Sequence, residues 1–267
     1  MDTSKLAKRL ARLQEKSSGG EGKNIWFKSG EEKTKIRQVP YPHEVNGEPF
    51  IEVYFHFNVA GHRSIVCPKM THGQPCPICE LAEEFKSMGN KDSWKMYKKL
   101  APKLRTYSPV IVRGKEDDGI KLWGYGSTIY ESLLEKYMDP EWGDLSDPKS
   151  GRDLTVWTIK QGSTGNDTEF DKPKMDVSPN SSPMLTKKSD IIKLLEGMPN
   201  YLNDGATFPV RSYQELQEIV RKLADVDDEE EDDVPSKIEK FIVEDSSDED
   251  DDDSDDDLSA KLKKLLD

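Results

Sequence analysis

The stretch Cys67–Cys79, CPKMTHGQPCPIC, holds all 3 cysteines of the 267-residue chain. Cys76 and Cys79 form a C-x-x-C pair, whose turn can present two thiolates to one tetrahedral ion, and Cys67 supplies a third sulfur. Thiolate donors with a histidine nearby favour zinc, which takes tetrahedral sulfur and nitrogen ligands. The stretch therefore predicts one zinc ion that pins a loop, rather than three unrelated free cysteines.

The spacing leaves the fourth ligand of this zinc site open. His72 lies inside the loop between Cys67 and Cys76, and spacing alone favours it. His56 lies on the polar face of a predicted strand before the loop and could reach the ion from outside. His62 lies in the turn between that strand and the loop.

The sequence argues against a catalytic role for the ion. The segment PCPIC matches one half of the zinc deaminase signature, but no histidine is followed by the x-Glu of the other half. Without a positioned general acid or base, a metal-bound water has no proton shuttle, and four protein ligands leave no open position. We therefore expect a structural zinc and no enzymatic activity. The alternative, a deaminase-like zinc-dependent nucleic-acid enzyme, would need an unassigned acidic residue beside an open metal site.

Alternating hydrophobic segments surround the loop. Strand patterns occur over 49–59, 105–114, 119–126 and 152–162, and helical patterns over 79–88 and 127–138. Short strands with a few inserted helices are typical of a small barrel. We expect an α+β fold with a mainly β core. No apolar run is long enough to span a bilayer, and no signal peptide is recognised, so we expect an intracellular protein.

The charge is distributed unevenly along the chain. Residues 225–267 carry 21 acidic and 5 basic side chains, a net charge of −16, whereas the rest carries a net charge of +3. Such an acidic segment cannot bury a core and is typical of disordered interaction tails. It ends in an amphipathic peptide that we expect to bind a protein partner through Leu258, Leu262, Leu265 and Leu266.

The chain begins with a basic amphipathic pattern that has no obvious place in the body. We expect residues 1–22 to bind a neighbouring copy of the protein, with Lys5, Lys8, Arg9 and Arg12 as the self-association residues. The predicted domains are therefore a cooperativity segment at 1–22, a binding core at 23–224 and an acidic tail at 225–267.

Basic and aromatic side chains alternate after the zinc loop. Between Lys86 and Arg113 there are 8 basic side chains and 1 acidic one, with three aromatic residues among them. Basic groups that follow phosphates, with aromatic faces on which bases stack, are typical of single-strand binding, and no recognition-helix motif indicates duplex binding. The candidate nucleic-acid-binding residues are Lys95, Tyr97, Lys98, Lys99, Lys103, Arg105, Tyr107, Lys121, Trp123, Tyr125, Trp157 and Lys160.

These motifs together resemble the single-stranded-DNA-binding, helix-destabilising protein of T-even-type phages. The segments that carry the resemblance are YFHFNV, C…THG…CP-x-C, RTYSPVIV, WGYGSTIY, VWTIKQ and the leucine-ended acidic tail. The resemblance implies an OB-fold barrel with an inserted zinc subdomain, and a basic, aromatic cleft that holds the strand. It also implies that the zinc ligands are His56, Cys67, Cys76 and Cys79.

The resemblance implies a protein that coats and protects single-stranded DNA cooperatively, without sequence preference, during replication, recombination and repair. Its expected partners are single-stranded DNA, further copies of itself, and replication, recombination and repair proteins of the polymerase, helicase-loader or primase class bound through the tail. If the chain is phage-encoded, we expect it in the host-cell cytoplasm. A further alternative takes the acidic tail as primary and predicts a chaperone for basic proteins, which the basic, aromatic stretch disfavours.

Overall fold

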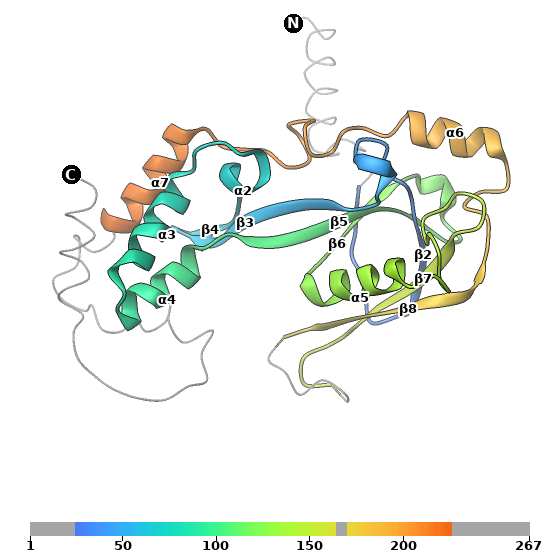
Figure 1. Ribbon diagram of the computed structural model, residues 1–267, viewed down its shortest axis with the longest axis horizontal. Coiled ribbons are helices and arrows are strands. Elements are labelled where there is room, and N and C mark those ends of the chain that lie inside the picture. The colour runs from blue at the N-terminus through green and yellow to red at the C-terminus, as the bar shows by residue number, and fades with distance from the viewer. Residues whose placement is uncertain (1–24, 164–169, 226–267) are drawn as a thin grey trace, which may run out of the picture. The chain divides into compact units, whose positions relative to one another are not determined.

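The computed structural model describes residues 25–163 and 170–225 (Figure 1). The chain divides into two compact units. Within the described residues, unit 1 consists of the residues up to Val53 together with Leu104–Thr207. Unit 2 consists of Tyr54–Lys103 together with the residues from Phe208 onward. The chain passes from unit 1 to unit 2 within strand β3 (Ile51–Val59) and returns within β5 (Lys103–Val112). The expected segments 1–22 and 226–267 lie outside the described residues.

One sheet dominates unit 1. Its strands run in the order β1-β6-β5-β2-β7-β8, and β3 pairs with β5 and with β4 (His62–Val66). All the pairs with a described register are antiparallel except β1 with β6. The remaining strands are β1 (Trp26–Phe27), β2 (Thr34–Gln38), β6 (Lys121–Tyr125), β7 (Arg152–Ile159) and β8 (Lys172–Ser181).

The segment that contains β1 and β2 closes a circuit of strands. It pairs with β6 through β1 and with β5 and β7 through β2, while β5 and β6 pair with each other. Between β1 and β2, the Thr158 backbone N–H donates to the Gly30 carbonyl at 2.7 Å, so this connection also follows β7. A closed circuit is what a small barrel requires. The predicted α+β fold with a mainly β core is confirmed, and the circuit agrees with the predicted OB-fold barrel.

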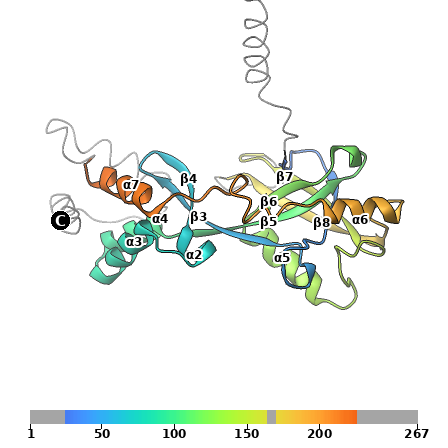
Figure 2. The ribbon, with the colours of Figure 1, turned by 90° about the horizontal axis from the view of Figure 1, so that it is seen from above.

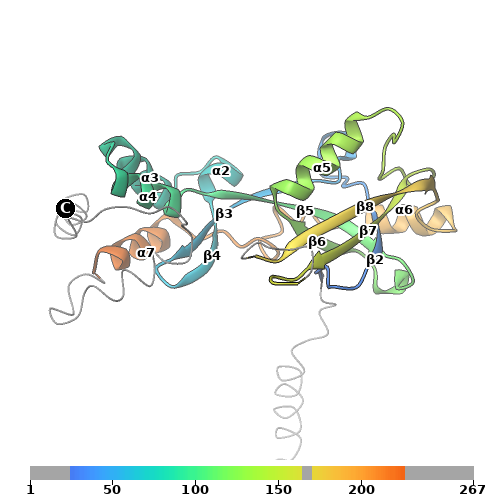
Figure 3. The ribbon, with the colours of Figure 1, turned by 90° about the horizontal axis from the view of Figure 1, so that it is seen from below.

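Strand alternation divides this sheet into a core face and an exterior face. Ile36, Val110, Trp123, Leu154 and Val156 meet in one buried cluster. Helix α5 (Ser127–Met138), which lies beside the sheet in Figure 3, completes this cluster with two further side chains. Those two are Ile129 and Leu133. The alternate residues of each strand lie on the opposite face, which we call the exterior face, although Arg37, Ile111 and Leu122 on it are also buried. The other helical segments of unit 1 are η1 (Val45–Gly47), η2 (Glu116–Asp118) and α6 (Lys188–Glu196).

Unit 2 is mainly helical. It contains the second half of β3, β4, and the helices α2 (Pro68–His72), α3 (Pro77–Met88), α4 (Lys91–Leu100) and α7 (Tyr213–Asp225) (Figure 2). Helix α3 contributes Ile78, Leu81 and Phe85 to its core, where α7 adds Leu216 and Ile219. The three cysteines lie in the same buried cluster.

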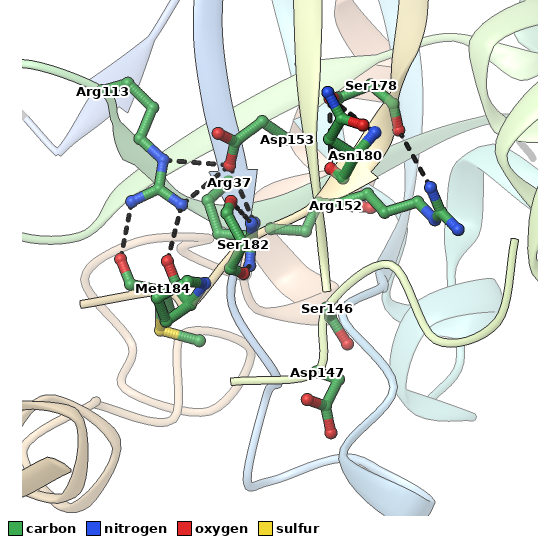
Figure 4. A network of polar contacts seen from close by, with 12 residues as sticks. Arg37, Arg113, Ser146, Asp147, Arg152, Asp153, Ser178, Asn180, Ser182 and Met184 are labelled. Atoms are coloured by element: carbon green, nitrogen blue, oxygen red, sulfur yellow. Dashed lines mark hydrogen bonds and ion pairs between the residues drawn. The ribbon is translucent and has the colours of Figure 1, made fainter. Parts of the chain in front are cut away.

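A network of ion pairs and hydrogen bonds joins four segments of unit 1 around the buried Arg37 (Figure 4). Arg37 is 0% exposed, and its Nε donates to the Asp153 carboxylate at 2.9 Å. Arg113 donates to the same oxygen through Nη2 at 2.8 Å and to the Met184 carbonyl through Nη1 at 2.6 Å. Arg37 also donates to the Ser182 carbonyl and hydroxyl, at 2.8 and 2.6 Å. Burial lowers the pKa of Arg37, and the charge of Asp153 opposes that shift.

We expect Asp153→Asn to lower the free energy of unfolding by about 3–5 kcal/mol, because it leaves a buried guanidinium without its counter-charge. Urea denaturation measures this change. The matched control is Asp171→Asn, which breaks the exposed pair between Lys160 and Asp171. Solvent and salt screen such an exposed pair, so breaking it should change the free energy of unfolding far less than Asp153→Asn does, and an equal loss in both variants would contradict a special role for the network around Arg37.

Candidate metal centre and nucleic-acid interface

His56 is held in one orientation inside unit 2. It is 0% exposed, and its Nδ1 lies 2.7 Å from the Leu100 carbonyl oxygen at the end of α4. A carbonyl oxygen only accepts, so Nδ1 must carry the proton and Nε2 must carry the lone pair. A histidine that binds a metal usually donates its other ring N–H in this way.

Two helix starts position the three sulfur atoms. Cys67 is the N-cap of α2, and its Sγ accepts from the Met70 N–H at 3.4 Å. Cys76 is the N-cap of α3, Pro77 is at the first turn, and Cys79 lies one turn further on. The C-x-x-C pair thus spans the start of a 12-residue helix, whose partial positive charge favours thiolates. Gly73 ends α2 with φ of 67°, which explains the glycine after Thr71 and His72.

The four side chains fit a tetrahedral ion. Their ligand atoms all lie within 4.8 Å of one another, and all four residues are buried. Cys67 Sγ lies 3.4 Å from Cys79 Sγ, and His56 Nε2 lies 3.4 Å from Cys76 Sγ and 3.7 Å from Cys79 Sγ. Zinc–ligand bonds of about 2.3 Å to sulfur and about 2.0–2.1 Å to nitrogen put neighbouring ligand atoms about 3.5–3.8 Å apart in a tetrahedron. The donor set therefore matches one metal ion.

The thiol chemistry of the cluster also calls for a cation. Hydrogen bonds from Cys76 and Cys79 lower the pKa of Cys67 to about 3. Hydrogen bonding to Cys67 and Cys76 raises the pKa of Cys79. The close packing of the three thiols thus opposes their simultaneous ionisation. Only a bound cation would let all three act as thiolate ligands at this spacing.

The other two candidate histidines lie apart from this group. His72, in α2, has a buried Nε2 that makes no hydrogen bond within the described part of the chain. His62 starts β4, and its Nδ1 faces Arg211 Nη2 at 3.5 Å. The structure thus brings His56, rather than the histidine that spacing favoured, to the cysteines.

Helix α4 carries most of the candidate interface residues of unit 2. Lys95 and Lys98 are exposed and Lys99 is half-buried, with its pKa lowered by burial. Lys95 pairs with Asp92 at 3.5 Å. The half-buried Tyr97 ring packs against Trp94, with centroids 5.1 Å apart, and under Lys86, whose Nζ lies 5.1 Å from the Tyr97 centroid. Lys103, at the end of the first segment of unit 2, is exposed.

Two glycines of unit 1 make room for an aromatic and cationic group on the exterior sheet face. Tyr107 pairs with Gly124, where an added Cβ would lie 2.7 Å from a Tyr107 ring carbon, so the ring lies across this glycine. At Gly126 an added Cβ would lie 3.0 Å from the Arg105 guanidinium. Arg105 therefore lies along the same face.

Trp26 completes this group, which we call the exterior platform (Trp26, Arg105, Tyr107, Gly124 and Gly126). The Trp26 ring is 43% exposed and contacts Tyr107 edge-on, with centroids 5.7 Å apart. Trp26 pairs with Leu122, two residues from Gly124, which places it on the same face as Tyr107. Sequence reasoning missed Trp26, because its role depends on the pairing of β1 with β6.

A second cation–aromatic contact lies on the exterior face at β7. Lys33 Nζ lies 4.4 Å from the centroid of the half-buried Trp157 ring. Trp157 pairs with Lys174 of β8, which puts a further basic residue on this face. Lys160 is exposed and pairs with Asp171 at 2.8 Å, which raises the pKa of Lys160. Lys33 and Lys174 were not among the candidate nucleic-acid-binding residues that the sequence indicated.

Two of the predicted stacking residues lie inside the core instead. Trp123 is 3% exposed and Tyr125 is 5% exposed, and both belong to the buried cluster of unit 1. The Tyr125 hydroxyl lies 2.7 Å from Ser108 Oγ, so even its polar end is satisfied internally. Burial raises the pKa of Tyr125. Neither ring offers a face to a base in this conformation, whereas Lys121 of the same strand is half-buried.

The self-association residues Lys5, Lys8, Arg9 and Arg12 lie outside the described residues, as do the partner-binding Leu258, Leu262, Leu265 and Leu266. Among the described helices, none combines the length and hydropathy needed to cross a bilayer.

The comparisons with known proteins agree with the site. A comparison with curated proteins found no match to the chain. The family described as gp32 DNA binding protein like matches residues 30–224, which include the metal-binding group and every candidate interface residue within the described chain except Trp26. This match confirms the resemblance to the T-even-type single-stranded-DNA-binding proteins. The chain belongs to the family of gp32-like DNA-binding proteins.

Proposed function

We propose that this protein binds single-stranded DNA without sequence preference and that its metal centre is structural. The exterior platform is the observation that carries the proposal. The Trp26 ring is 43% exposed, the half-buried Tyr107 ring lies against it, and the exposed Arg105 lies on the same face. Unpaired bases can stack on such rings while a cation meets the phosphates, and this mode tolerates any sequence because every base has a π-face. The membership in a DNA-binding family supports the same ligand.

The basic side chains of unit 2 extend the proposed interface. Lys98, Lys99 and Lys103 follow one another along the end of α4 and the start of β5. They would neutralise backbone phosphates, and Tyr97 would supply a further ring. In unit 1, Trp157 would likewise supply a ring for stacking, and Lys33 and Lys160 would supply cations for phosphates.

We further propose that the metal is zinc and that its role is to hold unit 2 in shape. His56, Cys67, Cys76 and Cys79 would hold the ion, and four protein ligands complete a tetrahedral zinc shell without a position for a reacting water. When bound, zinc supplies a fixed cross-link between β3, α2 and α3. This arrangement favours a binding protein over the alternative of a zinc-dependent nucleic-acid enzyme.

The biological role that we propose is the cooperative coating of single strands during replication, recombination and repair. Residues 1–22 would contact the next copy along the strand through their basic side chains. The acidic residues of 225–267, with a net charge of −16, would compete with DNA for the basic surface, and the terminal leucines would bind other replication proteins.

The first test is a salt titration of the affinity of the full chain for single-stranded and duplex DNA. We expect tighter binding of the single strand and a linear fall of log K with log salt. Tyr107→Ala should weaken single-strand binding by about 1–3 kcal/mol, because it removes a stacking face. Gly124→Ala should weaken it too, since the added Cβ displaces the Tyr107 ring.

The control for the Gly124 variant is Gly30→Ala, because an added Cβ at Gly30 meets nothing within 4 Å. Adding Gly124→Ala to Tyr107→Ala should cause little further loss, since the displaced ring is already absent. The proposed function would be contradicted if the protein binds duplex DNA more tightly than single strands. It would also be contradicted if neither Tyr107→Ala nor Gly124→Ala changes the affinity for single-stranded DNA.

The metal proposal is tested by elemental analysis and thermal unfolding. We expect one zinc ion per chain, and its removal by a chelator should lower Tm because the free energy of metal binding contributes to folding. His56→Ala should lose the metal, and the matched control His72→Ala should keep it. The reverse result would make His72 the ligand. If the purified protein holds no metal and a chelator leaves its Tm unchanged, the four residues do not form a metal site.

The tail proposal is tested by deleting residues 225–267. We expect the shortened protein to bind single-stranded DNA more tightly, with the largest gain at low salt, where charge interactions are least screened. The measurement is the affinity of both forms across a salt series. Equal affinities at low salt would show that the tail does not compete with DNA.

A further inference from the structure

A hollow of about 270 Å³ lies at the turn between α3 and α4 in unit 2. Its lining residues are Lys86, Gly89, Asn90, Lys91 and Trp94. Lys86, Lys91 and Trp94 lie in the basic, aromatic stretch that the sequence analysis singled out, but none of the lining residues is among its candidate nucleic-acid-binding residues or in the candidate metal-binding group. Its size approaches that of small ligand sites, which are about 300 Å³ and larger.

The turn itself is built to keep the two helix ends close together. Gly89 ends α3 with φ of 71°, a conformation that favours glycine. Asn90 then caps α4, and its side-chain oxygen accepts from the Ser93 N–H at 2.7 Å. Because only these two residues separate the helices, the last turn of α3 and the first turn of α4 line the same hollow.

The lining combines an aromatic face with positive charge. Trp94 is 45% exposed, an unusual position for a large ring, and it is supported from behind by Tyr97 with centroids 5.1 Å apart. Lys86 and Lys91 bring two cations, and the start of the 10-residue helix α4 adds partial positive charge. The nearby carboxylates do not line the hollow: Glu83 faces Lys86 at 3.9 Å and Asp92 faces Lys95 at 3.5 Å.

We propose that this hollow is a subsite for one nucleotide of the bound single strand. The base would stack on Trp94, and its phosphate would meet Lys86 and Lys91. This inference rests on the proposed function, since it names a further place where the same ligand binds. An aromatic ring beside two cations suits a nucleotide, which joins a π-face to a phosphate, better than it suits either an apolar ligand or a simple anion.

The test measures the affinity of full-length variants for a fluorescently labelled single strand. We expect Trp94→Ala to weaken binding about 5- to 150-fold, and Trp94→Phe to recover most of that loss because it keeps a ring face. The double variant Lys86→Gln/Lys91→Gln should flatten the slope of log K against log salt by about 0.7, the value for one phosphate of a single strand. Its matched control is Lys188→Gln/Lys193→Gln on α6, which removes two exposed lysines elsewhere and should leave the slope unchanged.

A strand that contains abasic sites separates the two parts of the subsite. On that strand Trp94→Ala should have no effect, whereas the lysine pair should keep its effect on the salt slope. Bound metal and thermal unfolding equal to those of the unchanged protein would show that each variant is folded.

Two results would overturn the subsite. If Trp94→Ala and the lysine pair bind like the unchanged protein while Tyr107→Ala binds weakly, the hollow is not part of the interface, although the proposed function stands. If Trp94→Ala weakens binding equally on abasic and complete strands, the ring does not stack on a base. Failure of the proposed function would instead appear as a lack of preference for single strands in the unchanged protein.

Discussion

The contact between His56 and the Leu100 carbonyl constrains the whole of unit 2. It fixes the proton on Nδ1 and directs Nε2 toward the sulfur atoms of Cys76 and Cys79. Through this one side chain, β3 is tied to the end of α4 and to the start of α3 at the same time. Among the described residues of unit 2, one buried cluster of helix and strand residues contains all three cysteines. A metal ion in that cluster would therefore stabilise a domain too small to rely on burial alone.

The proposed nucleic-acid contacts of unit 2 depend on the same constraint. Trp94 and Tyr97 lie on α4, the helix whose last residue is Leu100, and Lys86 lies on α3, the helix that begins at Cys76 and Pro77. A structural metal and the proposed binding surface would thus be connected by geometry, without any chemistry at the ion. This is why removal of the ion is expected to affect stability and binding together.

The described part of unit 1 is stabilised by its strand pairing and by an ion-pair network rather than by a metal-binding group. Its closed circuit of strands buries aliphatic and aromatic side chains on one face, and on the other the fully buried Arg37 joins the partly exposed Arg113 and Asp153 in an ion-pair network. Elsewhere on that exterior face, Gly124 and Gly126 leave space in which Tyr107 and Arg105 lie flat. The absence of two side chains leaves room for the half-buried Tyr107 ring and the exposed Arg105 guanidinium. The family match begins at residue 30, so Trp26 extends the platform beyond the matched region.

The sequence by itself determined the metal-binding loop, since Cys67, Cys76 and Cys79 lie within 13 consecutive residues and local spacing suffices to bring them together. It also determined the main strands and helices, because β3, β7, α3 and α5 show their periodicity in their own residues. Only the tertiary structure decided that His56 joins the cysteines, that Trp123 and Tyr125 face the core, and that Trp26 joins Tyr107. Alternation along a strand separates two faces but does not say which is buried, and the partners of these side chains come from segments that are far apart in the chain.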